Sequence, residues 1–210
     1  THGTTMHGMQ LLDEPTRPIS YYAPNSGVGK TLAKTPLLFG PNANVGIVGL
    51  GTGTLACYRK PGQTWQFFEI DPLIVEIARD RKVFSFLERC TPDAKITIGD
   101  ARLTLAEVPK SSFDVLALDA FSSDAIPLHL LTKEAFTTYG RALKADGILL
   151  VHISNRYIDL NPVIAAKAKA KATPASSSPA KAKAKSTAGA NSANAVAAVQ
   201  PVDVSSQAVT

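Results

Sequence analysis

Residues 45–53 read VGIVGLGTG, and this stretch decides the fold that we expect. Its first half is a short apolar run, as in a parallel strand that is covered on both faces. Its second half places Gly49, Gly51 and Gly53 directly before a helix-like segment, 53–60. Glycine suits such a turn because a side chain would hinder both the tight backbone and the close approach of a ligand. Strand, turn and helix together predict a nucleotide-binding α/β unit.

The residues that follow continue the same alternation. Near-continuously apolar runs predict further strands at 65–71, 95–100, 113–120 and 147–154. Helix-like stretches lie between them, at 72–82, 101–107 and 132–143. Alternating strands and helices with right-handed crossovers predict a doubly wound, mostly parallel sheet, which is a Rossmann-like α/β fold.

The spacing of the glycines separates two classes of nucleotide-binding domain. A dehydrogenase fingerprint, G-x-G-x-x-G, would need its third glycine at position 54, which is Thr54. The chain instead has G-x-G-x-G, the pattern of S-adenosylmethionine-dependent transferases, whose cofactor has no pyrophosphate. Glu69 ends the second strand, where a carboxylate can accept hydrogen bonds from both ribose hydroxyls. We therefore favour an S-adenosylmethionine-type ligand and a Rossmann-like fold of the class I methyltransferase type.

Further acids follow the ends of the other predicted strands. Asp100 and Ala101 follow the third strand, where we expect the carboxylate to lie beside an adenine amine, although Asp is also a favoured N-cap for a helix over 101–107. Asp119 ends the fourth strand, and Asp124 lies in the loop after it. Because ligands of open α/β sheets bind at the carboxyl edge, these acids predict a site for a cationic substrate.

The charge of the chain lies in its C-terminal tail. Residues 1–164 contain 16 basic and 16 acidic side chains, whereas residues 165–210 contain six lysines and one acid, Asp203. The tail contains AKAKAK twice and has no apolar face, so we expect residues 165–210 to be disordered. The alternative is a basic arm that contacts nucleic acid or anionic lipid through charge. We favour the solvated tail.

Three further expectations concern packing. The strand GILLVHIS (147–154) should lie at the sheet edge with an unpaired backbone, and an apolar edge favours self-association. His152 alternates with buried positions on this strand, which indicates a core histidine rather than a catalyst. Cys57 and Cys90 do not suggest a disulfide framework and suit a reducing compartment, with Cys57 as a packing residue.

The chain has no apolar run near the roughly 18–20 residues that span a bilayer, and no signal peptide opens it. It begins at Thr1, within the pattern HGTTMHGMQ, so we expect it to be a fragment of a longer protein. The preceding part of that protein could include a membrane anchor.

Several of these segments together resemble a known family. GLGTG (49–53), FFEIDP (67–72), IGDARLTL (98–105), FDVLALDAFSSDAIP (113–127) and the earlier GMQ and YY are similar to segments of the spermidine synthase family of aminopropyltransferases. They are closer still to bacterial spermidine synthase-like domains, which are often fused to membrane segments. The resemblance covers about residues 2–164, so the chain looks like an incomplete domain.

The resemblance implies a role for each matching residue. A segment before the core, residues 1–40, would form the substrate channel, and residues 41–164 would form the nucleoside-binding catalytic core. The implied roles are Gln10 at the ribose or sulfur, Tyr21 or Tyr22 in the amine channel, Glu69 at the ribose, Asp100 at the adenine, Asp119 as proton acceptor and Asp124 at the far end of the amine.

The chain departs from the family at three places. Thr52 stands where the family usually has an acid that contacts the aminopropyl ammonium of the cofactor. Residues 34–36 read Lys-Thr-Pro near the position of a family histidine that meets the amine. After residue 164 the chain continues as an Ala/Lys repeat instead of two more strands.

The sequence therefore leads to one main functional hypothesis and two alternatives. The first is a spermidine synthase-like transferase that moves an aminopropyl group from decarboxylated S-adenosylmethionine to a polyamine such as putrescine, without a metal. A methyltransferase that uses ordinary S-adenosylmethionine is the second, favoured by Thr52. The third is a degenerate nucleoside-binding domain with a basic tail, but we do not expect nucleic acid as a partner. We expect a cytoplasmic location, and leave open both a homo-oligomer and tethering to a membrane in a longer parent protein.

Overall fold

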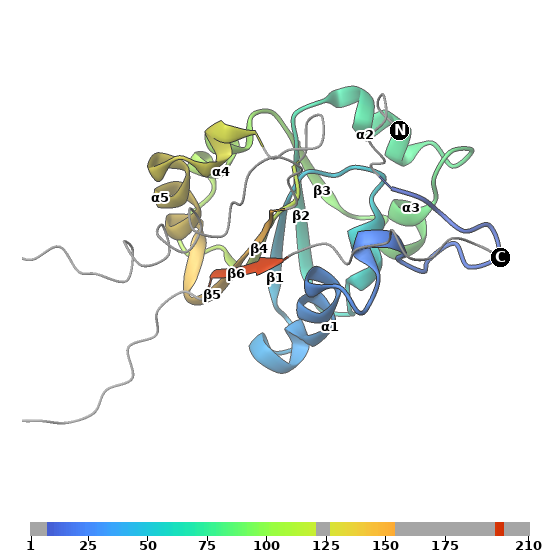
Figure 1. Ribbon diagram of the computed structural model, residues 1–210, viewed down its shortest axis with the longest axis horizontal. Helices are drawn as coiled ribbons and strands as arrows, with labels where there is room; N and C mark the ends of the chain where they lie inside the picture. Colours follow the sequence, from blue (N-terminus) through green and yellow to red (C-terminus); the bar gives the residue numbers. More distant parts are fainter. Residues whose placement is uncertain (1–7, 121–126, 154–195, 200–210) are drawn as a thin grey trace, which may run out of the picture.

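The computed structural model describes residues 8–120, 127–153 and 196–199. Within them, six strands form one sheet in the order β3-β2-β1-β4-β5-β6, and every neighbouring pair is parallel (Figure 1). The strands are β1 (Asn44–Val48), β2 (Thr64–Glu69), β3 (Lys95–Ile98), β4 (Phe113–Leu118), β5 (Leu143–His152) and β6 (Val196–Val199). The strand order reverses between β1 and β4, as in a doubly wound fold, so the predicted fold class is confirmed.

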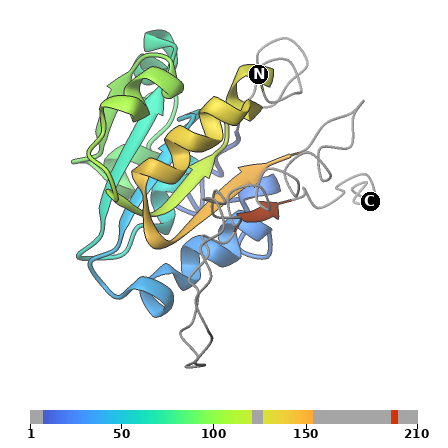
Figure 2. The ribbon, with the colours of Figure 1, turned by 90° about the vertical axis from the view of Figure 1, so that its left-hand side faces the viewer.

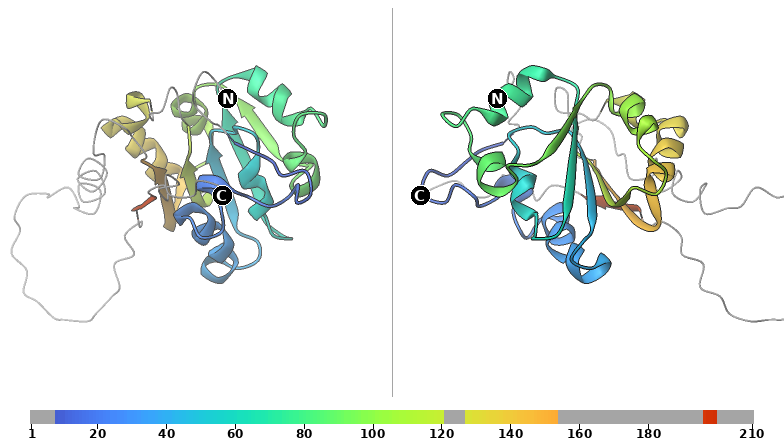
Figure 3. Two further views of the ribbon diagram at one scale, coloured as in Figure 1. Left: turned by 45° about the vertical axis from the view of Figure 1, so that its right-hand side comes forward. Right: turned by 180° about the vertical axis from the view of Figure 1, so that it is seen from behind.

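Helices cover both faces of this sheet. α4 (Ala101–Glu107) and α5 (Lys133–Ala142) lie on one face, and α1 (Gly27–Phe39) and α3 (Phe86–Cys90) lie on the other. Figures 2 and 3 show the two layers from further directions, with α5 in yellow and α1 in blue on opposite sides of the strands. α2 (Pro72–Arg79) packs with the layer of α1 and α3.

Alternation along the strands divides the core between the two layers. On β4, Leu116 and Leu118 belong to the apolar cluster beneath α4 and α5. Val115 and Ala117 belong to the cluster beneath α1 and α3. All four side chains are nearly inaccessible to solvent. The strand reads as a continuous apolar run because both of its faces are covered.

The helices differ from the prediction at several places. The helix predicted at 53–60 is a short 3-10 helix, η2 (Thr54–Tyr58), and the one predicted at 72–82 ends at Arg79. α4 has the predicted bounds, 101–107. α1 and α3 were not predicted, since α1 begins with Gly27 and contains Pro36, which are poor helix formers. None of the described helices is long and apolar enough to cross a membrane.

The prediction that β5 lies at the sheet edge is wrong. β6 pairs with it in parallel, from Leu149↔Val196 to His152↔Val199. This part of β5 therefore has a strand on each side, since Leu149 and Val151 also pair with β4. The four residues of β6 also correct the expectation of disorder for their part of the tail, and the remainder of 165–210 lies outside the described residues.

Candidate active site

A cavity of about 300 Å³ opens at the carboxyl ends of β1 to β4. This is where ligands of open α/β sheets bind, because the loops that follow the strands diverge there. Four acids line the cavity, and no lysine or arginine of the described residues does. The acids are Glu69, Asp71, Asp100 and Asp119, and the other polar lining residues are Tyr21, Tyr22 and His129.

The glycine turn forms one wall of the cavity through Gly49 and Gly51. Gly49 has a φ of 93°, and a Cβ at this position would lie 2.5 Å from the carbonyl oxygen of Asp119. Its N–H donates to the carbonyl of Phe68 at 2.8 Å. Only glycine therefore lets the end of β1 pass this close to the end of β4. Gly53 ends the turn in the left-handed region, with a φ of 83°.

Glu69 is fixed by the backbone around it. Its buried carboxylate accepts hydrogen bonds from the N–H groups of Leu50 (2.8 Å), Ile70 (2.9 Å) and Asp71 (3.0 Å). These donors join the glycine turn to the end of β2. A carboxylate has about four acceptor sites, so one remains for a hydroxyl in the cavity.

Asp100 combines both of the roles that the sequence suggested. Its side chain caps α4 by accepting from the N–H of Arg102 at 2.8 Å, and it also lines the cavity. Partial burial alone would raise the pKa of the Asp100 carboxyl. The hydrogen bond from the Arg102 backbone and the charge of the Arg102 guanidinium outweigh burial, so this pKa is lower than usual. Ala101, the first residue of α4, is buried and lines the cavity beside it.

Asp119 lies at the end of β4 with a partner on each carboxylate oxygen. Oδ2 accepts from the hydroxyl of Tyr22 at 2.5 Å, and Oδ1 is 2.7 Å from Nδ1 of His152. The Asp119 side chain is 9% exposed and that of His152 is 14% exposed. His152 is thus in contact with a predicted catalytic acid, whereas the sequence indicated a core histidine. The strand pattern could not show this contact, because it depends on the pairing of β5 with β4.

The two tyrosines belong to a short 3-10 helix, η1 (Ser20–Tyr22), and line the cavity beside Asp119. Burial, followed by the charge of Asp119, raises the pKa of Tyr21 to about 12. The same causes raise the pKa of Tyr22 further. Both hydroxyls therefore remain protonated at neutral pH, and Tyr22 is a hydrogen-bond donor to Asp119.

Of the predicted site residues, Gln10 and Gly53 are not in the described cavity lining, and Asp124 cannot be placed. The Gln10 amide bonds to the side chain and N–H of Ser85 and to the carbonyl of Pro15. The Thr52 hydroxyl is buried, 2.8 Å from that of Thr54. Asp124 lies outside the described residues. The roles of Gln10, Gly53 and Asp124 toward a ligand stay predictions.

A disulfide lies behind the glycine turn. Cys57 in η2 is bonded to Cys90 at the end of α3, with their Cα atoms 4.8 Å apart. The expectation that these cysteines form no disulfide is therefore wrong. Gly53 packs in the same place, since a Cβ there would lie 3.0 Å from the side chain of Leu87. The disulfide thus links η2, the helix that follows the glycine turn, covalently to α3.

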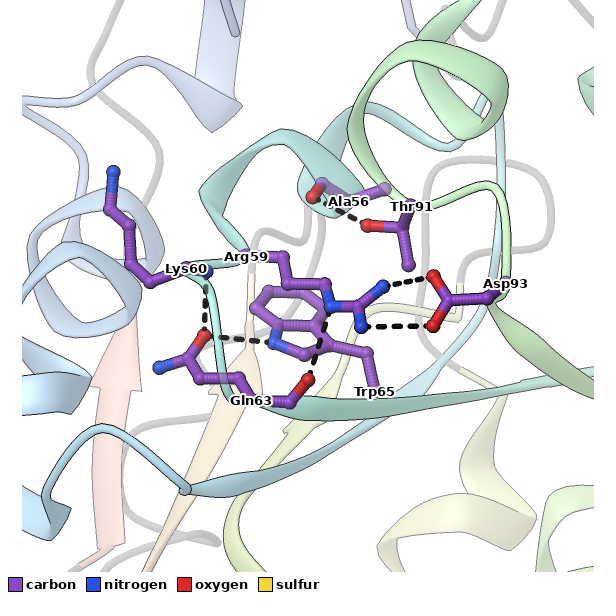
Figure 4. Close-up of polar contacts among 7 residues, drawn as sticks. All are labelled: Ala56, Arg59, Lys60, Gln63, Trp65, Thr91 and Asp93. Atoms are coloured by element: carbon purple, nitrogen blue, oxygen red, sulfur yellow. Dashed lines mark hydrogen bonds and ion pairs between the residues drawn. The ribbon is translucent and has the colours of Figure 1, made fainter.

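Polar contacts reinforce this link (Figure 4). The Arg59 guanidinium, just after η2, makes two hydrogen bonds to the carboxylate of Asp93, which precedes β3. The Thr91 hydroxyl donates to the carbonyl of Ala56 at 3.0 Å. Arg59 also donates through Nε to the carbonyl of Gln63 at 3.1 Å. The segment that follows the glycine turn is therefore held on two sides.

The sheet order and the position of the cavity define a Rossmann-like α/β domain of the class I methyltransferase type, with an acidic pocket at the switch point between β1 and β4. Among curated proteins, the polyamine aminopropyltransferase of Vibrio vulnificus (strain CMCP6) is 30% identical over 122 residues. This match covers 55% of the chain and 40% of the relative, so the chain spans about two fifths of that protein's length. It confirms the resemblance to the spermidine synthase family over that part of the chain. No protein-family model matches.

Solved structures of spermidine synthases also match part of the chain. The spermidine synthase of Thermotoga maritima is 31% identical, with 57% of this chain and 41% of that chain covered and a TM-score of 0.45. A spermidine synthase in complex with the transition state analogue AdoDATO is also 31% identical, with 57% and 42% covered and a TM-score of 0.47. A probable spermidine synthase from Corynebacterium glutamicum is 23% identical, with 55% and 41% covered and a TM-score of 0.46. Because these TM-scores lie below 0.5, the fold assignment rests on the sheet order itself.

Proposed function

We propose that this chain carries the nucleoside and amine sites of an aminopropyltransferase, which moves an aminopropyl group from decarboxylated S-adenosylmethionine to a polyamine such as putrescine. The observation that carries the proposal is the place of Asp119, a nearly buried carboxylate in the wall of a cavity lined by acids. Such a cavity favours a ligand with positive charge. The similarity to a polyamine aminopropyltransferase supports the same reaction.

Asp119 would act on the amine. A primary amine is protonated at pH 7, since its pKa lies near 10, and it must lose a proton before it can attack. Asp119 would attract the ammonium group and then accept this proton. The nitrogen lone pair would form a bond to the aminopropyl carbon next to the sulfonium. The carbon–sulfur bond would break with its electron pair going to sulfur, which leaves methylthioadenosine.

The other residues of the cavity would hold the nucleoside. Glu69 has one free acceptor position for a ribose hydroxyl, and Asp100 would accept from the adenine amine. Tyr22 would hold Asp119 in place through its hydroxyl. Much of the rate in such a reaction comes from alignment of nitrogen, carbon and sulfur, to which this rigid wall would contribute.

An Asp119→Asn variant tests the role of this acid. The amide is nearly isosteric but cannot accept the proton, so we expect turnover with putrescine to fall by about a hundredfold or more. A thermal melt controls for folding, and we expect the melting temperature to stay within a few degrees of the parent. Turnover within a factor of two of the parent would show that Asp119 is not the proton acceptor.

A methyltransferase that uses ordinary S-adenosylmethionine is the second candidate, and Thr52 is the observation in its favour. The buried Thr52 hydroxyl brings no negative charge to the place where the family has an acid. Calorimetry with the two cofactors side by side separates the candidates. We expect the decarboxylated form to bind at least about tenfold more tightly, because the carboxylate of the ordinary form would meet an acidic cavity. Tighter binding of ordinary S-adenosylmethionine would favour the methyltransferase.

A further inference from the structure

The Tyr58 hydroxyl contacts a residue of the cavity wall, and the proposed reaction does not use this contact. Tyr58 is buried and is the last residue of η2. Its hydroxyl donates to the main-chain carbonyl of Tyr22 in η1 at 2.5 Å. The two residues are 36 positions apart in the sequence. The hydrogen bond therefore joins the segment after the glycine turn to the segment that carries the two tyrosines of the cavity.

The Tyr22 carbonyl depends on this hydroxyl. Tyr22 is buried, and no other donor of the described residues reaches its carbonyl. A buried carbonyl without a donor is costly, so loss of the Tyr58 hydroxyl should make η1 move or admit water. The side chain of Tyr22 donates to Oδ2 of Asp119 at 2.5 Å. Tyr22 thus connects Tyr58 with the proposed proton acceptor.

The backbone of η1 indicates that contacts from other elements hold it. Ser20, its first residue, has a φ of 60°, in the left-handed region that residues other than glycine seldom adopt. Such a conformation persists only where the surrounding structure fixes it. η1 has three residues, so its own hydrogen bonds are few. The Tyr58 hydroxyl is a contact of this kind from a separate element.

The space around the Tyr58 hydroxyl is closely filled. A Cβ added to Gly29 in α1 would lie 2.6 Å from this hydroxyl and 2.3 Å from the carbonyl oxygen of Ala23. Glycine therefore lets α1 approach both η1 and η2. The Ala23 carbonyl accepts from the N–H of Ser26, the N-cap of α1. Three elements meet at this point, so the hydroxyl has little room to move.

We propose that Tyr58 is a positioning residue of the amine site, because its hydroxyl fixes the main chain of Tyr22 and thereby the Tyr22 hydroxyl that orients Asp119. The proposal depends on the proposed function in that putrescine turnover is one of its readouts. Because η2 follows the glycine turn directly, Tyr58 joins the nucleoside side of the cavity to the amine side. Loss of its hydroxyl should misalign the proton acceptor and leave the residues proposed to hold the nucleoside in place.

The first test measures turnover in Tyr58→Phe, which keeps the ring and removes only the hydroxyl. We expect kcat with putrescine to fall about tenfold, because a small displacement of an aligned group lowers the rate strongly. The KM for decarboxylated S-adenosylmethionine should stay within about twofold of the parent value, since the nucleoside contacts are kept. An unchanged kcat in an active chain would overturn the proposal.

Thr91→Val is the matched control for this variant. It removes another buried hydroxyl that bonds to a carbonyl next to the glycine turn, that of Ala56 in η2 (Figure 4). This bond joins η2 to the end of α3 and not to η1. We therefore expect Thr91→Val to keep the kcat of the parent. A loss as large as that of Tyr58→Phe would attribute the effect to η2 as a whole and would overturn the proposal.

A double variant tests whether Tyr58 acts through Tyr22. Tyr22→Phe alone removes the hydroxyl that Tyr58 would position, and it should lower kcat at least as much as Tyr58→Phe does. The double variant Tyr22→Phe with Tyr58→Phe should then fall no further than Tyr22→Phe, because the two residues act as one unit. Losses that multiply would show that Tyr58 acts independently of Tyr22, against the proposal.

The last test needs no substrate. In NMR spectra of the parent, the Tyr22 hydroxyl proton should exchange slowly with water, because it is buried in a hydrogen bond to Asp119, and its signal is assigned by its absence in Tyr22→Phe. The signal should disappear through faster exchange in Tyr58→Phe and persist in Thr91→Val. A signal that persists in Tyr58→Phe, or is absent from the parent, would overturn the inference. If the signal behaves as expected and the parent does not turn over putrescine, the positioning role is correct and the proposed substrate is wrong.

Discussion

Asp100 is a residue at which a structural role and a binding role can be separated. Asp100→Asn keeps an N-cap, because asparagine caps helices about as well as aspartate. We expect it to retain the melting temperature and to weaken methylthioadenosine binding about fivefold, since the acceptor loses its charge. Asp100→Ala should lose about 1 kcal/mol of stability as well, and ten- to a hundredfold in affinity. Thermal melts and calorimetry check both variants, and an unchanged affinity in both would leave Asp100 with capping alone.

The pKa of Asp100 decides at which pH these variants should be compared with the parent. Its carboxyl has a lowered pKa in the folded chain. The stability that the ionised carboxylate adds is therefore present above the unfolded pKa, near 4, and is lost only as pH falls through the lower folded value. Measurements at pH 7 thus compare variants with an ionised parent.

The site residues that follow strand ends could be predicted from the sequence, and His152 could not. Glu69, Asp100 and Asp119 line one cavity because parallel strands bring their carboxyl ends to the same edge. His152 meets Asp119 only through the lateral register of β5 on β4. A sequence pattern along one strand contains no information on that register. The contacts of Gln10 could not be predicted for a similar reason: its partner Ser85 is 75 residues away in the sequence.

At the scale of elements, the strands were predicted well and the connections poorly. β1, β2 and β4 are largely buried and apolar, which gives a strong local signal, whereas β3 is partly exposed. α4 was found because Asp100 marks its first turn. The pairing of Cys57 with Cys90 depends on the packing of η2 against α3, and α3 itself has only five residues. Such a short helix is determined by tertiary contacts more than by propensity.

We expect the disulfide between Cys57 and Cys90 to stabilise the fold. It closes a loop across a separation of 33 residues, so its removal should cost about 2–4 kcal/mol. We expect reductant to lower the melting temperature of the parent and to weaken methylthioadenosine binding, because η2 follows the glycine turn directly. The double variant Cys57→Ser with Cys90→Ser is the control, and it should melt at the lower temperature with or without reductant. Two thiols that react with iodoacetamide in the unreduced, folded parent would contradict the disulfide.

At the scale of the whole molecule, β6 overturns two expectations: that β5 lies at the sheet edge and that this part of the tail is disordered. Because the Ala/Lys repeat has no apolar face, we expected the tail to be disordered and to add no strand to the sheet. The structure pairs Val196–Val199 with β5, which lies next to the central strand β4. The tail residues that join the sheet thus come near the end of the chain, beyond the repeat. This arrangement was not predictable because parallel pairing between distant segments leaves no local signal.

Truncation tests whether β6 protects the sheet. A chain that ends at residue 165 would expose the backbone donors and acceptors of β5 between Leu149 and His152, an apolar stretch without proline. Such an edge is a template for another strand, so we expect this truncated chain to self-associate and to melt a few degrees lower than the parent. A chain that ends at residue 199 keeps β6 and is the matched control, which should behave as the parent does. Light scattering at tens of micromolar measures association directly. A clean monomer after truncation at 165, with the parent's melting temperature, would show that the pairing of β6 with β5 does not stabilise the domain.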